Sequence, residues 1–301
     1  MKKHRKYFLL LILSVLSCVH KPGNQVLRYG EEPDDVEIPI YSFAVHPLHN
    51  PSKLIHDYQP LIDYLNAKEV GAKFTIEASR NYALFEEKYK SGKPDFLLSN
   101  PWQTLQAMNF GYTVIAMAGE PNDFKGIFIV RKDGGIRIPQ DLKGKAVSYP
   151  APTALAACIM PQYFLYRAGL NVSTDIENKY VGSQESSIMN VYMKLTVAGA
   201  TWPPPWRAFR KDHPNEASEL KVIWETEPLI NNSVMVHNRI PSNIIGHVQK
   251  LLTELDATEE GRLILAGMET ARFLPASDTD YNVVHDYIGQ FEKEVRKIEI
   301  R

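Results

Sequence analysis

The chain has 301 residues, of which 44% are hydrophobic and 23% charged, and its formal net charge is -1. This is the composition of a globular protein with room for two domains of ordinary size. The near-neutral charge argues against nucleic acid as a partner, because that class of protein carries a basic surface.

The first 17 residues have the pattern of an export signal. Four basic residues precede an apolar run at 8–16, which is too short to span a membrane as a helix. Removal of residues 1–17 takes away those four cations and no acid, so the mature net charge becomes about -5. The sequence therefore predicts a signal peptide at 1–17 and a protein of the periplasm.

The end of this signal resembles the bacterial lipobox. It has the sequence VLSC at positions 15–18, and the resemblance implies that Cys18 is acylated and anchors the mature chain to a membrane. Val19 is not Asp, which by the same resemblance points to the outer membrane. Residues 18–37 are mostly polar and contain Pro and Gly, which is typical of a flexible tether. An ordinary signal peptide with a chance cysteine is the alternative.

The chain has two cysteines, Cys18 and Cys158. If Cys18 carries lipid, the mature protein has no internal disulfide. Cys158 has two interpretations. It is either a small buried hydrophobe or, near the start of a helix, a thiol with a lowered pKa that acts as a nucleophile or soft ligand.

From residue 38 onward, short β-type runs alternate with helical patterns. In the first half we expect strands at 38–45, 73–78, 95–99 and 113–118, and helices at 54–67, 82–89 and 101–109. This alternation predicts a mainly parallel sheet that is covered by helices on both faces.

A polar break at 120–125 precedes a second α/β series. Here we expect strands at 126–131, 146–149, 178–181, 197–201 and 220–224, helices from 153 and at 185–195, and a rigid Pro-rich turn at 202–206. An extended run at 234–237 and helices at 242–255, 259–266 and 281–298 follow. These last helices are too many for the second half alone, so we expect them to cover the first.

The predicted fold class is therefore α/β, with two α/β domains, a hinge and a cleft between them. The first domain comprises residues 38–119 and 234–301, and the second comprises residues 120–233. The segments 119–126 and 228–233 would form the hinge.

One loop of the second series has the geometry of a binding site. The strand at 146–149 is followed by a breaker at 150–152 and then by Thr153, a plausible helix N-cap. The first turn of a helix has unpaired N–H groups and a positive dipole end, which suit an anion. The next residues, 154–158, are nevertheless apolar.

Five stretches, in chain order, resemble the phosphate/phosphite/phosphonate-binding family of periplasmic solute-binding proteins. They are SRNY at 79–82, PDFLLSNP at 94–101, GIFIVRKD at 126–133, DLKGKAV at 141–147 and LKVIWETEPL at 220–229. The resemblance covers roughly residues 38–275 and implies a periplasmic-binding-protein-like (type II) fold. It also implies a binder that closes on its ligand, hands it to a transporter, and has no catalytic activity and no cofactor.

The ligand residues of that family are mostly replaced. Its Ser-Thr-Ser run falls on residues 154–156, where Thr153 supplies a single hydroxyl after a one-residue shift. Its His falls on Gln184 and its late Asp on Ser233, while Tyr82 is retained. A buried oxyanion without donors would cost several kcal/mol. We therefore expect an apolar cleft and a hydrophobic ligand, a lipid such as a sterol or hopanoid.

Other interpretations stay open. A small aromatic or quaternary amine would suit a cage of Tyr82, Trp102, Trp202 and Trp206. A family-typical phosphonate, phosphite or phosphate would use Thr153, backbone N–H groups, Gln184 and Ser233, as in an ABC importer. A periplasmic sensor subunit and an enzyme that uses Cys158 are the alternatives from other classes.

The predicted site residues follow from these arguments. They are Tyr82, Trp102, Thr153, Cys158, Gln184, Trp202 and Ser233. The stretch HPLH at 46–49 has no carboxylate or cysteine at ligand spacing, so we expect no metal. The expected partners are the ligand, the membrane components of a transporter, and the membrane itself through the anchor at Cys18.

Overall fold

The computed structural model describes residues 38–69 and 71–299. The predicted signal at 1–17, the tether at 18–37 and the lipidation site Cys18 lie outside these residues. Residues from 38 onward form one compact unit, which contains two separate sheets.

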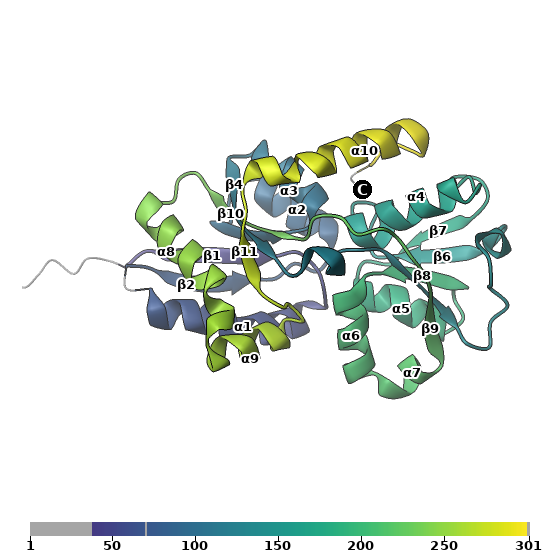
Figure 1. Ribbon diagram of the computed structural model, residues 1–301, viewed down its shortest axis with the longest axis horizontal. Helices are drawn as coiled ribbons and strands as arrows, with labels where there is room; N and C mark the ends of the chain where they lie inside the picture. The colour runs from purple at the N-terminus through teal and green to yellow at the C-terminus, as the bar shows by residue number, and fades with distance from the viewer. Residues whose placement is uncertain (1–37, 70, 300–301) are drawn as a thin grey trace, which may run out of the picture. The chain divides into compact units, whose positions relative to one another are not determined.

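The first sheet has six strands in the spatial order β11-β4-β10-β3-β1-β2 (Figure 1). Its strands are β1 (Ile40–Val45), β2 (Lys73–Glu77), β3 (Phe96–Ser99), β4 (Tyr112–Ala118), β10 (Ser233–His237) and β11 (Phe273–Pro275). β1 pairs in parallel with β2 and β3, whereas β10 runs antiparallel to β3 and β4, and β11 antiparallel to β4.

The second sheet has five strands in the order β7-β6-β8-β5-β9. Its strands are β5 (Ile127–Arg131), β6 (Ala146–Tyr149), β7 (Glu177–Tyr180), β8 (Ala198–Thr201) and β9 (Leu220–Glu225). β6 is parallel to β7 and β8, and β5 is antiparallel to β8 and β9. The α/β class is confirmed, but both sheets are mixed. The prediction of a mainly parallel sheet was therefore wrong. β5 and β10 each follow a crossing from the other sheet, and each runs antiparallel to both of its neighbours.

The helices of the first half and of the C-terminal part pack around the first sheet. They are α1 (Pro51–Lys68), α2 (Tyr82–Lys90), α3 (Pro101–Met108), α8 (Ser242–Thr253), α9 (Glu259–Gly267) and α10 (Asn282–Glu294). α1 contacts β2 and α9, α8 contacts β4 and β11, and α10 contacts α3. The late helices thus return to the first half of the chain, as the sequence predicts.

The second sheet is accompanied by shorter helices. They are the π-helix η3 (Leu155–Ile159), α4 (Met160–Arg167), α5 (Gln184–Tyr192), α6 (Pro203–Asp212) and α7 (Pro214–Ser218). α5 contacts β6 and β8, and α7 contacts β9. The sequence analysis did not predict α7 and β11, which have only five and three residues.

Asparagine begins three helices of the first half. The side chains of Asn50, Asn81 and Asn100 each accept a hydrogen bond from the backbone N–H three residues later, at the starts of α1, α2 and α3. An asparagine N-cap satisfies an N–H group that the helix itself leaves unpaired. At α3, the side-chain oxygen of Gln103 in turn accepts a hydrogen bond from the backbone N–H of Asn100, which completes a capping box.

The sequence predicts a rigid turn at the run of three prolines, but the structure has no separate turn there. Trp202 is the N-cap of α6, and the prolines are the first residues of that helix, from Pro203. Proline suits the first turn of a helix because the N–H group it lacks would have no partner there. The helix then continues to Asp212.

Two connections link the sheets. Residues 119–126 lead from β4 to β5, and residues 226–232 lead from β9 to β10. These are the places where the sequence predicts a hinge. We keep as a proposal the division into one domain of residues 38–119 and 234–301 and another of residues 120–233. Within the described part of the chain, no helix has both the length and the apolar character needed to cross a membrane.

Candidate ligand-binding site

Two small cavities lie between elements that belong to the two sheets. The first, which we call the loop cavity, is lined by His46, Tyr82, Asn100, Phe124, Ala154, Leu155, Ala156, Ala157, Gln184, Trp202 and Asn232. Its volume is about 10 Å³, close to the space that one water molecule requires. Of the predicted site residues, Tyr82, Gln184 and Trp202 line it.

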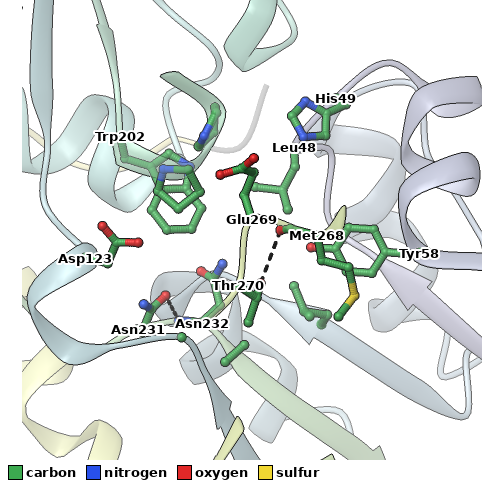
Figure 2. Close-up of a pocket in the computed structure, with 15 residues that line it drawn as sticks. Leu48, His49, Tyr58, Asp123, Trp202, Asn231, Asn232, Met268, Glu269 and Thr270 are labelled. Carbon is green, nitrogen blue, oxygen red and sulfur yellow. Dashed lines mark hydrogen bonds between the residues drawn. The ribbon is translucent and has the colours of Figure 1, made fainter. Parts of the chain in front are cut away.

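The second cavity, which we call the Asp123 cavity, adjoins the first, since Trp202 and Asn232 line both. Figure 2 shows Asp123 and Trp202 on one side of it and His49 and Tyr58 on the other. Its volume is about 20 Å³. The structure is thus closed around this region.

The backbone of η3 forms one wall of the loop cavity. The first hydrogen bond that runs back along this segment joins Ile159 N to Ala154 O, at 3.2 Å. The N–H groups of residues 155–158 therefore precede the first closed turn, where a helix has no acceptor of its own for them. Because Ala154 to Ala157 line the cavity, the N–H groups of residues 155–157 can serve as donors to a bound anion.

Thr153 has a different role from the predicted N-cap. Ala154 occupies the N-cap position of η3 and makes no side-chain capping bond. The hydroxyl of Thr153 donates instead to Oε1 of Glu86 in α2, at 2.6 Å. Asn100 Nδ2 donates to the Thr153 carbonyl at 3.3 Å. The loop before η3 is thus tied to α2 and to the start of α3.

Glu86, which the sequence analysis did not single out, is only 1% exposed. Besides Thr153, its Oε1 accepts a bond from Gln103 Nε2 at 3.4 Å. Burial raises the pKa of its carboxyl, while the two hydrogen bonds and the charge of Lys90 act in the opposite direction. A helical pattern with an apolar face offers no signal for such an acid, because its burial depends on partners distant in the sequence.

Gln184 and Tyr82 form a second link across the site. Gln184 Nε2 donates to the Tyr82 hydroxyl at 3.0 Å, and its Oε1 accepts from Thr201 at 2.9 Å. Burial raises the pKa of Tyr82, so the phenol keeps its hydrogen. Since the phenol oxygen accepts from Gln184, its O–H remains able to donate to a ligand.

His46, considered in the sequence analysis only as a metal ligand, lines the loop cavity. Its Nδ1 lies 3.1 Å from the Leu98 carbonyl. A carbonyl can only accept, so Nδ1 carries the hydrogen and Nε2 of the neutral ring is an acceptor. Burial lowers the pKa of His46 to about 4. No cluster of metal-ligating type occurs among residues 38–69 and 71–299.

Buried polar atoms without a protein partner also lie in this region. Asn232 lines both cavities, and its Oδ1 has no hydrogen-bond partner among the described residues. The Oγ of Ser99, at the end of β3 and directly before Asn100, is in the same situation. Buried polar atoms are normally paired, so Asn232 Oδ1, which belongs to a lining residue, is available to a ligand or to water.

Cys158 does not have the lowered pKa that the sequence analysis considered. It is fully buried, and that burial raises the pKa of its thiol to about 12. Arg296 Nη2, 3.7 Å from Sγ, acts in the opposite direction but is the smaller effect. The thiol therefore stays protonated at neutral pH, and it is not among the residues that line either cavity.

Trp102 and Ser233 belong to the interior beside the site. The Ser233 hydroxyl is 2.6 Å from that of Thr104, and both are fully buried. Trp102 is only 4% exposed and packs in the main core. Neither lines the two cavities, so their role in binding stays a prediction.

The aromatic cage, one of the alternatives left open by the sequence, is not assembled in this structure, because Trp202 and Trp206 pack against different rings. Trp202 packs against Phe124, with ring centroids 5.3 Å apart, while Trp206 stacks on Phe209 further along α6. Pockets for drug-sized ligands have volumes of about 300–1,000 Å³, far above those of the two cavities. A hydrophobic ligand of that size, like an oxyanion, could enter only after the cavities open, so their volumes do not decide between the two ligands.

Ion pairs connect α6 with elements of the first sheet near the Asp123 cavity. Arg207 Nε lies 3.0 Å from Glu269 Oε2, and its Nη2 lies 2.7 Å from Asp123 Oδ2. Lys53 of α1 pairs with Asp212 of α6 at 2.9 Å. Together they hold the second sheet's α6 against α1 and the segment after α9.

Two mixed α/β sheets joined by two crossings, with buried polar groups between them, are the architecture of solute-binding proteins of the periplasmic type. The chain belongs to the family described as the periplasmic substrate-binding protein of phosphonate ABC transporters, whose model matches residues 43–281. This is a family of binding proteins and not of enzymes, and its members act with the membrane components of an ABC transporter. The family resemblance in the sequence is thus confirmed.

Similar proteins agree with this assignment. A probable ABC transporter phosphite-binding protein of Prochlorococcus marinus (strain MIT 9301) is 24% identical over 310 residues, which cover 97% of this chain and 99% of that protein. The crystal structure of a binding protein of an ABC phosphonate transporter from Pseudomonas aeruginosa has a TM-score of 0.79 at 14% identity. The match covers 86% of this chain and 88% of the Pseudomonas aeruginosa chain.

The methylphosphonate complex of the Prochlorococcus marinus protein superposes with a TM-score of 0.75 at 19% identity, over 84% of this chain and 98% of its own. At such identities these structures establish the fold alone. They confirm the predicted periplasmic-binding-protein-like fold. The family supports the oxyanion alternative better than the hydrophobic ligand that the replaced residues suggest.

Proposed function

We propose that this protein binds an oxyanion of the phosphonate or phosphite class in the loop cavity and delivers it to an ABC importer. The observation that carries the proposal is that residues 154–157, around the start of η3, line the loop cavity. The chain also belongs to a family of binding proteins of phosphonate transporters. The names of the relatives, phosphite-binding in one case and a methylphosphonate complex in another, support the same class.

The donors would come from the backbone more than from side chains. The N–H groups of residues 155–157 and the Tyr82 hydroxyl would replace the hydroxyls that the family run of Ser and Thr would supply. Hydrogen bonds to a charged group contribute about 1.5–3 kcal/mol each. Backbone donors do not depend on side-chain identity, so Ala and Leu are compatible with anion binding in this loop.

Entry of a ligand requires opening, because the loop cavity of about 10 Å³ is smaller than any such anion. The two connections at 119–126 and 226–232 are the only links in the chain path between the sheets within residues 71–299. Rotation about them would separate Gln184 from Tyr82 and widen the cavity.

The test is isothermal titration calorimetry of the mature protein with phosphite, methylphosphonate and phosphate. Sterol-containing phospholipid vesicles and sulfate serve as comparisons. We expect at least one of the three phosphorus oxyanions to bind. In a thermal-shift experiment at 100 times its dissociation constant, that ligand should add about 2.7 kcal/mol of stability. Binding of the vesicles alone would overturn the proposal and restore the hydrophobic ligand.

A backbone variant tests the loop itself. Ala156→Pro removes one N–H donor at a position before the first closed turn, where proline is tolerated. We expect the affinity for the oxyanion to fall by a factor of about 10–100, the equivalent of one charge-assisted hydrogen bond. Ser242→Pro, at the first position of α8, is the matched control and should leave the affinity unchanged.

We also propose that Cys18 is acylated, so that the periplasmic protein is anchored to a membrane. The support is the sequence at 15–18. Mass spectrometry of the membrane fraction should find a lipid-modified N-terminal cysteine, and Cys18→Ser should release the protein in soluble form. A soluble, unmodified wild type would instead indicate an ordinary signal peptide. No observation favours the sensor alternative, which stays a prediction.

A further inference from the structure

Glu86, a buried acid that is hydrogen-bonded to the loop of the proposed anion site, has no role in the function proposed so far. Glu86 lies one helical turn after Tyr82 in α2, and its Oε1 accepts a hydrogen bond from Thr153 at 2.6 Å. Thr153 directly precedes Ala154, the first of the four loop residues that line the cavity. The Glu86 carboxyl is therefore hydrogen-bonded to the loop that would bind an anion.

The groups around Glu86 leave its charge poorly compensated. Its two hydrogen-bond donors, Thr153 from the loop and Gln103 from α3, are both neutral. The other titratable groups that act on it belong to its own helix. They are Lys90, which favours the ionised carboxyl, and the phenols of Tyr82 and Tyr89, whose ionisation the carboxyl opposes. Since Glu86 is 1% exposed, water screens it little.

An ionised Glu86 and a bound anion would repel each other. Two like charges at one buried site raise the affinity of the pair for a proton, so one of the two groups takes it up. Burial already raises the pKa of the Glu86 carboxyl in the unoccupied site. A proton on Oε2 leaves Oε1 free to keep accepting from Thr153, so no existing hydrogen bond has to break.

We propose that Glu86 couples anion binding to protonation: one proton enters from solvent with the ligand and is held either by the Glu86 carboxyl or by the bound oxyanion. This inference rests on the proposed function, because it concerns the same cavity. It makes Glu86 a specificity-determining residue, which admits a singly charged or proton-carrying oxyanion and disfavours a fully ionised one. Above the pH at which the free groups are ionised, the affinity falls tenfold for each pH unit.

The experiment measures the number of protons taken up on binding. Calorimetric titrations with phosphite and with methylphosphonate are run in two buffers of different ionisation enthalpy, at a pH where the free ligand has lost its second proton. The wild type should take up about one proton per ligand, and Glu86→Gln close to none. Glu87→Gln, which changes the next and exposed residue, is the matched control and should behave as the wild type.

A second variant keeps Glu86 in place. Thr153→Val removes the hydrogen bond that favours the ionised carboxyl, so at a pH where both free groups are ionised the affinity should be higher than in the wild type. This readout also serves if Glu86→Gln does not fold.

The outcomes separate the two proposals. Uptake of one proton by both the wild type and Glu86→Gln would assign the proton to another group and overturn the inference. Binding of the oxyanion by the wild type without proton uptake would also overturn it, while the proposed function would stand. An absence of oxyanion binding would overturn the proposed function, and the inference with it.

Discussion

At the scale of single residues, His46 shows how burial controls a titratable group. His46 is 1% exposed, and its Nδ1 donates a hydrogen bond to the uncharged carbonyl of Leu98. Burial lowers its pKa from 6.5 to about 4, so it is a neutral acceptor in the cavity wall at physiological pH. The same residue looked unremarkable in the sequence, because two histidines spaced by Pro and Leu carry no signal of burial.

This shift predicts a pH dependence of stability. Below pH 6.5 the unfolded chain binds a proton at His46 that the folded protein binds only near pH 4. The free energy of unfolding should therefore fall as the pH decreases through this window, by about 3 kcal/mol from this residue. In His46→Gln the fall should be smaller, as measured by urea unfolding at pH 7 and pH 4.5.

Two controls accompany this measurement. His49, whose pKa burial also lowers, should leave part of the pH dependence in the variant. His56→Gln changes an exposed residue of α1 and should retain the full fall of the wild type. An equal pH dependence in His46→Gln and in the wild type would contradict the assignment.

Cys158 makes a second prediction at this scale. With its pKa raised to about 12, the thiol should not react with an aromatic disulfide reagent at pH 8 while the protein is folded. In a Cys18→Ser background, denaturant should expose one reactive thiol per chain, detected by the absorbance of the released chromophore. Rapid labelling of the folded protein would show that the thiol is accessible and would reopen a reactive role.

At the scale of elements, proline has opposite effects in α1 and α6. Pro203 is at the start of α6, where a helix has no use for the missing N–H, whereas Pro60 lies inside α1. The hydrophobic pattern of residues 54–67 predicted one continuous helix, and the structure has one from Pro51 to Lys68. Packing of its buried face outweighs the local cost of the internal proline.

This difference can be measured with two alanine variants. Pro60→Ala, on an exposed face of α1, should stabilise the protein, with about 3 kcal/mol as the upper limit set by helix propensity. Pro203→Ala should destabilise it by about 0.4–1 kcal/mol, since it gives the unfolded chain more freedom. Thermal or urea unfolding decides the signs, and a destabilised Pro60→Ala would contradict the argument.

The local structure at η3 is the part of the fold that the sequence predicts least well. The pattern at 146–158 correctly placed the strand and the helix that follows it, but not the π-type turn between residues 155 and 159. A single-turn irregularity has no sequence periodicity of its own. It matters here because it sets which N–H groups lack an acceptor within the helix at the wall of the loop cavity.

At the scale of the whole molecule, ion pairs of Glu269 join α6 to the segment after α9. Glu269 contacts Arg207 and Lys211 of α6, and its side chain is 11% exposed while theirs are 39% and 67% exposed. Such partly exposed pairs contribute about 0–1 kcal/mol each. They are therefore expected to bias an open-to-closed equilibrium modestly and not to lock it.

Removing this contact should be visible in binding. Glu269→Gln should lower the affinity for the oxyanion by a factor of up to about five, because the closed form becomes less favoured. Small-angle scattering without ligand should show a larger radius of gyration. Glu260→Gln, an exposed acid of α9, serves as the control and should change neither quantity. A variant identical to the wild type in both measurements would show that these pairs do not favour closure.

The sequence by itself determined the α/β class, most helices and strands to within a few residues, the two crossings, and the family. These features depend on local periodicity, helix caps and motifs that occur in order along the chain. The tertiary structure decided the contacts of the site: Thr153 with Glu86, 67 positions apart, and Tyr82 with Gln184, 102 positions apart. Two crossings bring these partners together, and no local pattern encodes which buried side chain will meet which.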